Sequence, residues 1–140
     1  MDVMDIKMLP DRVEAGMLLS LFRSALQEFK HGSLDKNEFM ILLTQLTDRQ
    51  ICTYELLEQD TRNEVDNVVK ALWNVDSYDD VDILLSIVVN LGLSQSFNKI
   101  KQSLHTNKDM KPMIRNEIEE TVAEVGKYIS NPYHDLERFK

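Results

Sequence analysis

Apolar side chains recur every three or four residues through most of this 140-residue chain, and this spacing limits the fold more than any other feature of the sequence. On a helix such residues share one face, whereas a half-buried strand needs strict alternation of apolar and polar residues, which no segment sustains. The clearest stripe lies between residues 10 and 30 and consists of Val13, Met17, Leu21, Ala25 and Phe29. We therefore predict an all-α fold.

Residues that start and stop helices divide this pattern into about seven helices. Three pairs have the spacing of a capping box, in which side chains satisfy free N–H groups at a helix start. These pairs are Asp35 with Glu38, Thr61 with Glu64, and Ser77 with Asp80. Gly32, Gly92 and the Asn131-Pro132 pair are placed to end helices. The expected helices span about residues 10–30, 35–46, 78–91 and 110–130, and three more begin near Asp48, Thr61 and Ser94.

The length of the chain suits a single domain. We expect N-terminal helices in residues 1–60, helical hairpins in residues 61–130 and a tail in residues 131–140. The helix near residues 78–91 is apolar nearly all round, which is typical of the most enclosed element of a fold. Its apolar run is broken by polar residues and falls short of the ~20 residues that cross a bilayer, so we predict no membrane segment.

The N-terminus and the single cysteine favour a cytoplasmic protein. Asp2 and Asp5 stand where a signal peptide needs positive charge. Cys52 has no second cysteine to pair with, which suits a reducing compartment. No basic cluster surrounds Cys52 in the sequence, so we interpret it as a small core residue and not as a reactive thiol.

The net charge of −8 is concentrated in one part of the chain. Residues 55–82 contain nine acids and only two bases, Arg62 and Lys70, so 28 residues carry seven of the net negative charges. A negative surface disfavours nucleic acid, whose phosphates require basic residues. Helix starts use one or two acids each, and a larger excess repels itself unless a basic partner is bound. The predicted partner is therefore a basic protein.

The candidate partner-binding residues come from this segment. They are Glu58, Asp60, Asp76, Tyr78, Asp79, Asp80 and Asp82. Tyr78 is included because a tyrosine in a turn between helices is expected to be exposed, and tyrosines often anchor interfaces. Trp73 has helical spacing from Val69 and is expected in the core instead.

No motif in the sequence indicates catalysis, a cofactor or a metal. Residues 32–39 resemble the second half of an EF-hand, but the positions that should carry calcium ligands hold Gln27, Phe29 and His31. The histidines at 31, 105 and 134 are not at metal-ligand spacing. Adjacent carboxylates such as Glu119 and Glu120 are interpreted as solvated helix ends. We predict a protein that is not an enzyme.

Two helices resemble each other in sequence, since residues 64–74 and 80–90 are identical at three of eleven positions. Acid-then-apolar helix starts fall at residues 38, 80 and 117, and these spacings lie near the ~40 to 47 residues of helical-hairpin repeats. A genuine repeat and the chance likeness of amphipathic helices remain equal alternatives. Residues 61–130 nevertheless resemble a HEAT-type helical-repeat domain.

The chain is also similar to the small all-α immunity proteins of bacterial toxin systems. The resemblance rests on Trp73-Asn74, the acidic turn at residues 76–80 and the helix end at residues 90–93. It implies a cytoplasmic inhibitor that binds a cognate toxin and acts by occlusion. The alternative is a self-associating structural or regulatory protein, in which the helix around residues 83–89 forms a homodimer interface.

Overall fold

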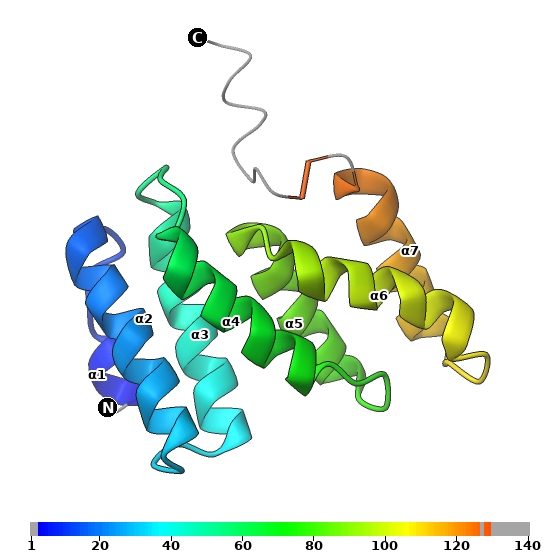
Figure 1. Ribbon diagram of the computed structural model, residues 1–140, viewed down its shortest axis with the longest axis horizontal. Coiled ribbons are helices and arrows are strands. Elements are labelled where there is room, and N and C mark those ends of the chain that lie inside the picture. The colour runs from blue at the N-terminus through cyan, green and yellow to red at the C-terminus, as the bar shows by residue number, and fades with distance from the viewer. Residues whose placement is uncertain (1–2, 127, 130–140) are drawn as a thin grey trace, which may run out of the picture. The chain divides into compact units, whose positions relative to one another are not determined.

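The computed structural model describes residues 3–126 and 128–129, and all regular structure in these residues is helical, as predicted. Figure 1 shows the helices in chain order. They are α1 (Val3–Lys7), α2 (Ala15–Lys30), α3 (Lys36–Ile51), α4 (Gln59–Leu72), α5 (Tyr78–Leu91), α6 (Ser94–Thr106) and α7 (Pro112–Val125). Within these residues no helix is long and apolar enough to cross a membrane.

The chain forms two compact units that divide between Glu64 and Val65, inside α4. The sequence predicts a boundary between N-terminal helices and helical hairpins at residue 60, four residues before this division. It places both parts in a single domain, which stays a prediction. Because the division lies inside α4, this helix contributes residues to both units.

In the first unit, α2 and α3 form a hairpin, and α1 packs on α3. Gly32 has a φ of 80° and lets the chain reverse after α2, a conformation that glycine adopts without steric cost. The predicted capping box is confirmed, because Glu38 N donates to Asp35 Oδ1 (2.8 Å) and Asp35 N donates to Glu38 Oε1 (3.2 Å). The core is formed by Leu18, Phe22, Leu26, Phe39, Leu42, Leu43 and Leu46.

Arg49 explains why no helix starts at Pro10. Its side chain is 5% exposed and donates to the backbone oxygens of Lys7 (3.3 Å), Leu9 (2.8 Å) and Pro10 (3.1 Å). These bonds end α1 and hold the following residues outside any helix, so α2 begins only at Ala15. The predicted helix start at Pro10 is wrong because a distant arginine takes its carbonyl.

One further helix start and one burial prediction are also wrong, and one predicted cap is misplaced. Asp48 does not cap a new helix, because α3 continues through it to Ile51, and its neighbours Thr47 and Gln50 are buried. Cys52 follows the last turn of α3 and is exposed instead of buried. The Thr61 and Glu64 pair lies inside α4, which starts two residues earlier at Gln59.

In the second unit, α5, α6 and α7 pack on one another. The apolar face of α5 is enclosed by the chain itself, with Val81, Leu84, Leu85, Ile87 and Val88 all buried. Trp73 is 8% exposed, as expected for a core residue. Gly92 ends α5 in the left-handed conformation (φ 69°), which confirms its predicted role. The predicted stop at Asn131-Pro132 lies outside the described residues.

Both ends of α6 are held by side chains from other helices. Asp66 in α4 is 4% exposed and accepts hydrogen bonds from the backbone N–H groups of Gln95 (3.0 Å) and Ser96 (2.8 Å). Arg115 in α7 donates to the carbonyls of Leu104 (2.9 Å) and Asn107 (3.1 Å). A carboxylate therefore caps the start of α6 and a guanidinium its end, which matches the helix dipole.

Candidate functional site

The candidate residues predicted from the sequence fall into both units. Glu58 and Asp60 lie at the start of α4 in the first unit. The other five surround the start of α5 in the second unit: Asp76, Tyr78, Asp79, Asp80 and Asp82. The structure therefore brings together five of the seven, and these five are the basis of the site.

The carboxylate of Glu58 already binds neighbouring groups of its own unit. Its carboxylate accepts hydrogen bonds from the backbone N–H groups of Asp60 (3.1 Å) and Thr61 (3.0 Å) and from Thr61 Oγ1 (2.7 Å). Arg23 pairs with the same carboxylate at 3.4 Å. The hydrogen bonds from Thr61, with smaller contributions from Asp60 and Arg23, hold the pKa of Glu58 below its ordinary value. Glu58 is thus a helix cap for α4.

Capping explains part of the acidic cluster at α5. Ser77 has extended backbone angles, and its Oγ accepts a hydrogen bond from Asp80 N at 3.3 Å, so the predicted cap is confirmed. Asp79 and Asp80 lie in the first turn, where negative charge is favourable. Asp82 lies beyond this turn and is exposed, so capping does not account for it.

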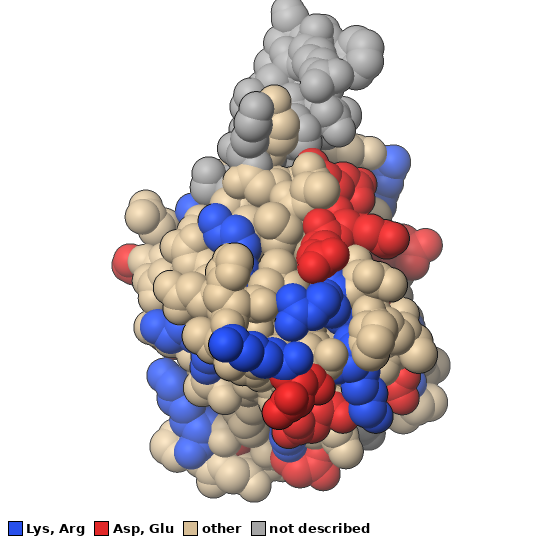
Figure 2. Space-filling view, turned by 90° about the vertical axis from the view of Figure 1, so that its right-hand side faces the viewer, with Lys and Arg blue, Asp and Glu red and all other residues tan. Residues whose placement is uncertain are grey.

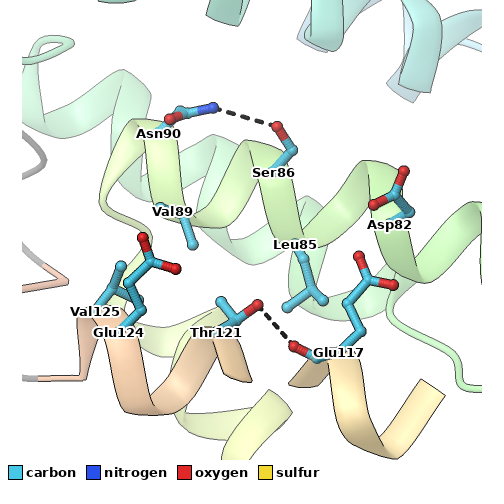
Figure 3. Close-up of a pocket in the computed structure, with 9 residues that line it drawn as sticks. All are labelled: Asp82, Leu85, Ser86, Val89, Asn90, Glu117, Thr121, Glu124 and Val125. Carbon is cyan, nitrogen blue, oxygen red and sulfur yellow. Dashed lines mark hydrogen bonds between the residues drawn. The ribbon is translucent and has the colours of Figure 1, made fainter. Parts of the chain in front are cut away.

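Asp82 belongs to a groove between α5 and α7. Figure 3 shows that these helices run side by side with residue numbers increasing in the same direction. The groove has a volume of about 260 Å³. Its lining, which we call the acidic groove, consists of Asp82, Leu85, Ser86, Val89, Asn90, Glu117, Thr121, Glu124 and Val125. Leu85 and Val89 line its middle, Val125 lies at the end beside Glu124, and polar side chains from both helices line its edges.

The side chains of the acidic groove form two acidic positions. Asp82 and Glu117 face each other across one end, whereas Glu124 extends toward α5 near the other end (Figure 3). Between them, Thr121 Oγ1 donates to the carbonyl of Glu117 at 2.8 Å, and Asn90 Nδ2 donates to Ser86 Oγ at 3.2 Å. The hydroxyl groups of the edges are therefore largely used within their own helices.

Glu117 is the most perturbed group of the acidic groove. Its Oε2 atom is enclosed by protein and accepts no hydrogen bond of ordinary length from the described residues. Burial raises the pKa of Glu117, and the adjacent carboxyl of Asp82 raises it further, although a hydrogen bond from Tyr78 acts in the opposite direction. The same contact, together with the charge of Glu117, raises the pKa of the Tyr78 hydroxyl. Tyr78, Asp82 and Glu117 thus form one interacting cluster.

Within the described part of the chain, no basic side chain neutralises this cluster. No lysine or arginine is among the lining residues, and no described base forms an ion pair with Asp82, Glu117 or Glu124. In the first unit, by contrast, Glu58 pairs with Arg23, and Glu64 with Lys30 at 3.5 Å. On the face drawn in Figure 2, acidic side chains gather in groups with basic side chains between them. The unneutralised negative charge is therefore confined to groups of acidic side chains and does not cover this whole face.

Sequence reasoning missed the residues that α7 and the far end of α5 contribute. Glu117 and Glu124 are seven residues apart and share one face of α7, while Asp82, Ser86 and Asn90 recur every four residues on α5. These two polar stripes were the available signal, but only Asp82 was predicted to bind a partner, and Ser86 and Asn90 were interpreted as interruptions of an apolar run. Pairing them required knowledge that α5 packs on α7.

The groove has limited chemical scope. At about 260 Å³ it lies below the range of ~300 to 1,000 Å³ that is usual for ligand pockets, so it suits a side chain better than a cofactor. Among the described residues, no group of three or more histidine, cysteine, aspartate or glutamate side chains could hold a metal ion. No family model, curated protein or solved structure matches the chain.

Proposed function

We propose that this protein is a non-enzymatic binding module that receives a basic partner at the acidic groove and the adjoining start of α5. The observation that carries the proposal is the placement of Glu117. Its partly enclosed carboxylate lies beside Asp82, and no described base neutralises either group. Two carboxylates in contact disfavour full ionisation of both, and a cation between them reverses this effect.

The groove also fits the shape of a basic side chain. Lysine and arginine combine a long aliphatic stem with a charged end, and they bury the stem along apolar surface while the charge meets polar groups. Leu85 and Val89 offer such a surface, with Asp82 and Glu117 at one end. The acidic residues at 76, 79 and 80 add a field that steers a basic protein toward this part of the surface.

The biological role that we propose is neutralisation of a cognate bacterial toxin in the cytoplasm, by occlusion of the toxin. Support comes from the all-α fold and from the resemblance to immunity proteins at Trp73-Asn74, the acidic turn at residues 76–80 and the helix end at residues 90–93. The acid pair of Asp82 and Glu117 would also suit general acid catalysis. We favour binding, because the groove is small and its two hydroxyl groups, those of Ser86 and Thr121, are hydrogen-bonded within their own helices.

The test of this proposal is recovery of the partner from the native cell with tagged protein. The wild type should retain a basic protein, and the double variant Asp82→Asn, Glu117→Gln should lose it. Glu119→Gln is the matched control, because Glu119 lies on α7 but outside the groove. With the purified partner, charge reversal at Asp76 and Asp79 should slow association and reduce its salt dependence. A partner that is not basic, or that binds the double variant equally well, would contradict the proposal.

The second candidate function is self-association, and the distribution of charge supports it. Residues 99–115 contain Lys99, Lys101, Lys108, Lys111 and Arg115 against the single acid Asp109. A second copy could therefore supply a basic segment to the acidic groove. The apolar residues of α5 do not support a dimer, since the chain itself already covers most of them. Light scattering at low and high salt distinguishes the alternatives, because a monomer under both conditions removes this candidate.

A further inference from the structure

The acidic groove has two charged positions at a fixed separation. Glu117 and Glu124 lie seven residues apart on α7, which at 1.5 Å per residue corresponds to about 10.5 Å along the helix axis. The first position is doubled by Asp82 across the groove, and the second is bordered by Asn90. Leu85 and Val89 lie between the two positions. Along its length the groove is therefore acidic at one end, apolar in the middle and acidic at the other end.

A helical partner matches this arrangement better than an extended one. An extended peptide gains much of its affinity from main-chain hydrogen bonds to a free sheet edge. The described residues contain no strand, and α5 and α7 use their backbone groups internally. A helix satisfies its own backbone and can lie over the seam between two helices, with only side chains entering the groove. Two residues seven apart on such a helix share a face and are also about 10.5 Å apart.

We propose that the acidic groove recognises a helix of the basic partner that carries two basic residues seven positions apart, with an apolar residue between them. The residue at the Asp82 and Glu117 end is an arginine, because its planar guanidinium has five donors and can bridge two carboxylates, which an ammonium group does less well. The second basic residue meets Glu124, and the apolar residue contacts Leu85 and Val89. This inference rests on the proposed binding of a basic partner and specifies the segment that is bound.

Two synthetic alanine-rich helical peptides of identical composition test the inference. The first has arginines at positions i and i+7 with a leucine at i+4, so that all three share one face. The second has the arginines at i and i+5, which places them on different faces. Circular dichroism verifies equal helicity, and titration of isotope-labelled protein followed by NMR gives each dissociation constant at low salt. The first peptide should bind about fivefold tighter or more, because only it can make both charge-assisted contacts together.

Variants of the protein assign this preference to the groove. The double variant Asp82→Asn, Glu117→Gln and the single variant Glu124→Gln should each reduce the preference to less than about twofold, since each removes one of the two acidic positions. Glu119→Gln changes the same charge on the same helix outside the groove and should leave the preference intact. Amide shifts should map to α5 and α7.

The outcomes separate this inference from the proposed function. Equal affinity for both peptides, with the expected weakening by salt, would overturn the recognition of spacing and leave the acidic binding surface standing. A preference that survives in the double variant Asp82→Asn, Glu117→Gln would also overturn it, because both carboxylates of the first position would then be gone and another surface would be responsible. Binding of neither peptide would overturn both the inference and the proposed function.

Discussion

Replacing Glu117 with glutamine should stabilise the protein and weaken its binding at the same time. Glutamine keeps the shape of the side chain and removes its charge, so the packing on α5 is preserved. The pKa of Glu117 is raised by burial and by Asp82, which means that the folded state holds this proton more tightly than the unfolded state does. Above this raised pKa, the folded protein carries an unfavourable charge that the variant lacks.

The size of the effect follows from the partial exposure of Glu117. A fully buried carboxylate pair would cost several kcal/mol, but solvent screens a group in an open groove. We therefore expect Glu117→Gln to raise the free energy of unfolding by only about 0.3 to 1 kcal/mol at pH 7. The gain should fade as the pH falls through the raised pKa and vanish below the ordinary carboxyl range, where wild-type Glu117 is protonated in both states.

Urea denaturation followed by the fluorescence of Trp73 measures this difference. Trp73 is the only tryptophan, is buried, and belongs to the unit that contains the acidic groove. Measurements at pH 7 and pH 4, with Glu119→Gln as control, separate a local effect of Glu117 from a general effect of net charge. A loss of stability at pH 7, or a gain that is equal at both pH values, would refute the electrostatic reasoning.

Three further predictions concern the scaffold that holds the site. Asp66→Ala should lower the free energy of unfolding by about 2 to 4 kcal/mol in urea denaturation, because it leaves the start of α6 without its buried acceptor. Gly92→Ala should cost about 1 to 2 kcal/mol in thermal unfolding, since alanine is strained at a φ of 69°. Glu58→Gln should be less stable than the wild type at pH 7. Since the pKa of Glu58 is lowered, that difference should shrink as the pH falls through the carboxyl range, and peptide binding at the acidic groove should not change.

Local signals in the sequence predicted local structure well. The capping box at Asp35, the serine cap at Ser77 and the glycine end at Gly92 depend on atoms within a few residues, so their spacing is sufficient to recognise them. The predicted exposure of Tyr78 is also confirmed, at 39%. In each case the few residues around the position decide which backbone conformation it adopts.

Predictions failed where a distant residue decided the outcome. The helix start at Pro10 was wrong because Arg49, 39 positions away in sequence, takes its carbonyl. The acidic groove was recognised only on its α5 side, because the role of Glu117 depends on packing against a helix 35 residues earlier. Patterns within one helix reveal which face is polar, but they do not reveal which other polar face it will meet. The α7 side of the candidate site therefore could not be predicted from the sequence alone.

The contacts of Arg49 have a practical consequence for the first ten residues. Helix α1 has only five residues, too few for a helix to be stable in water without tertiary contacts. Removal of this segment would also take away three carbonyl acceptors from a guanidinium that is almost fully enclosed. A shortened chain would leave Arg49 with only the main-chain and side-chain oxygens of Gln45 as acceptors. N-terminal trimming should therefore lower the stability of the first unit, and should not behave like the loss of a dispensable end.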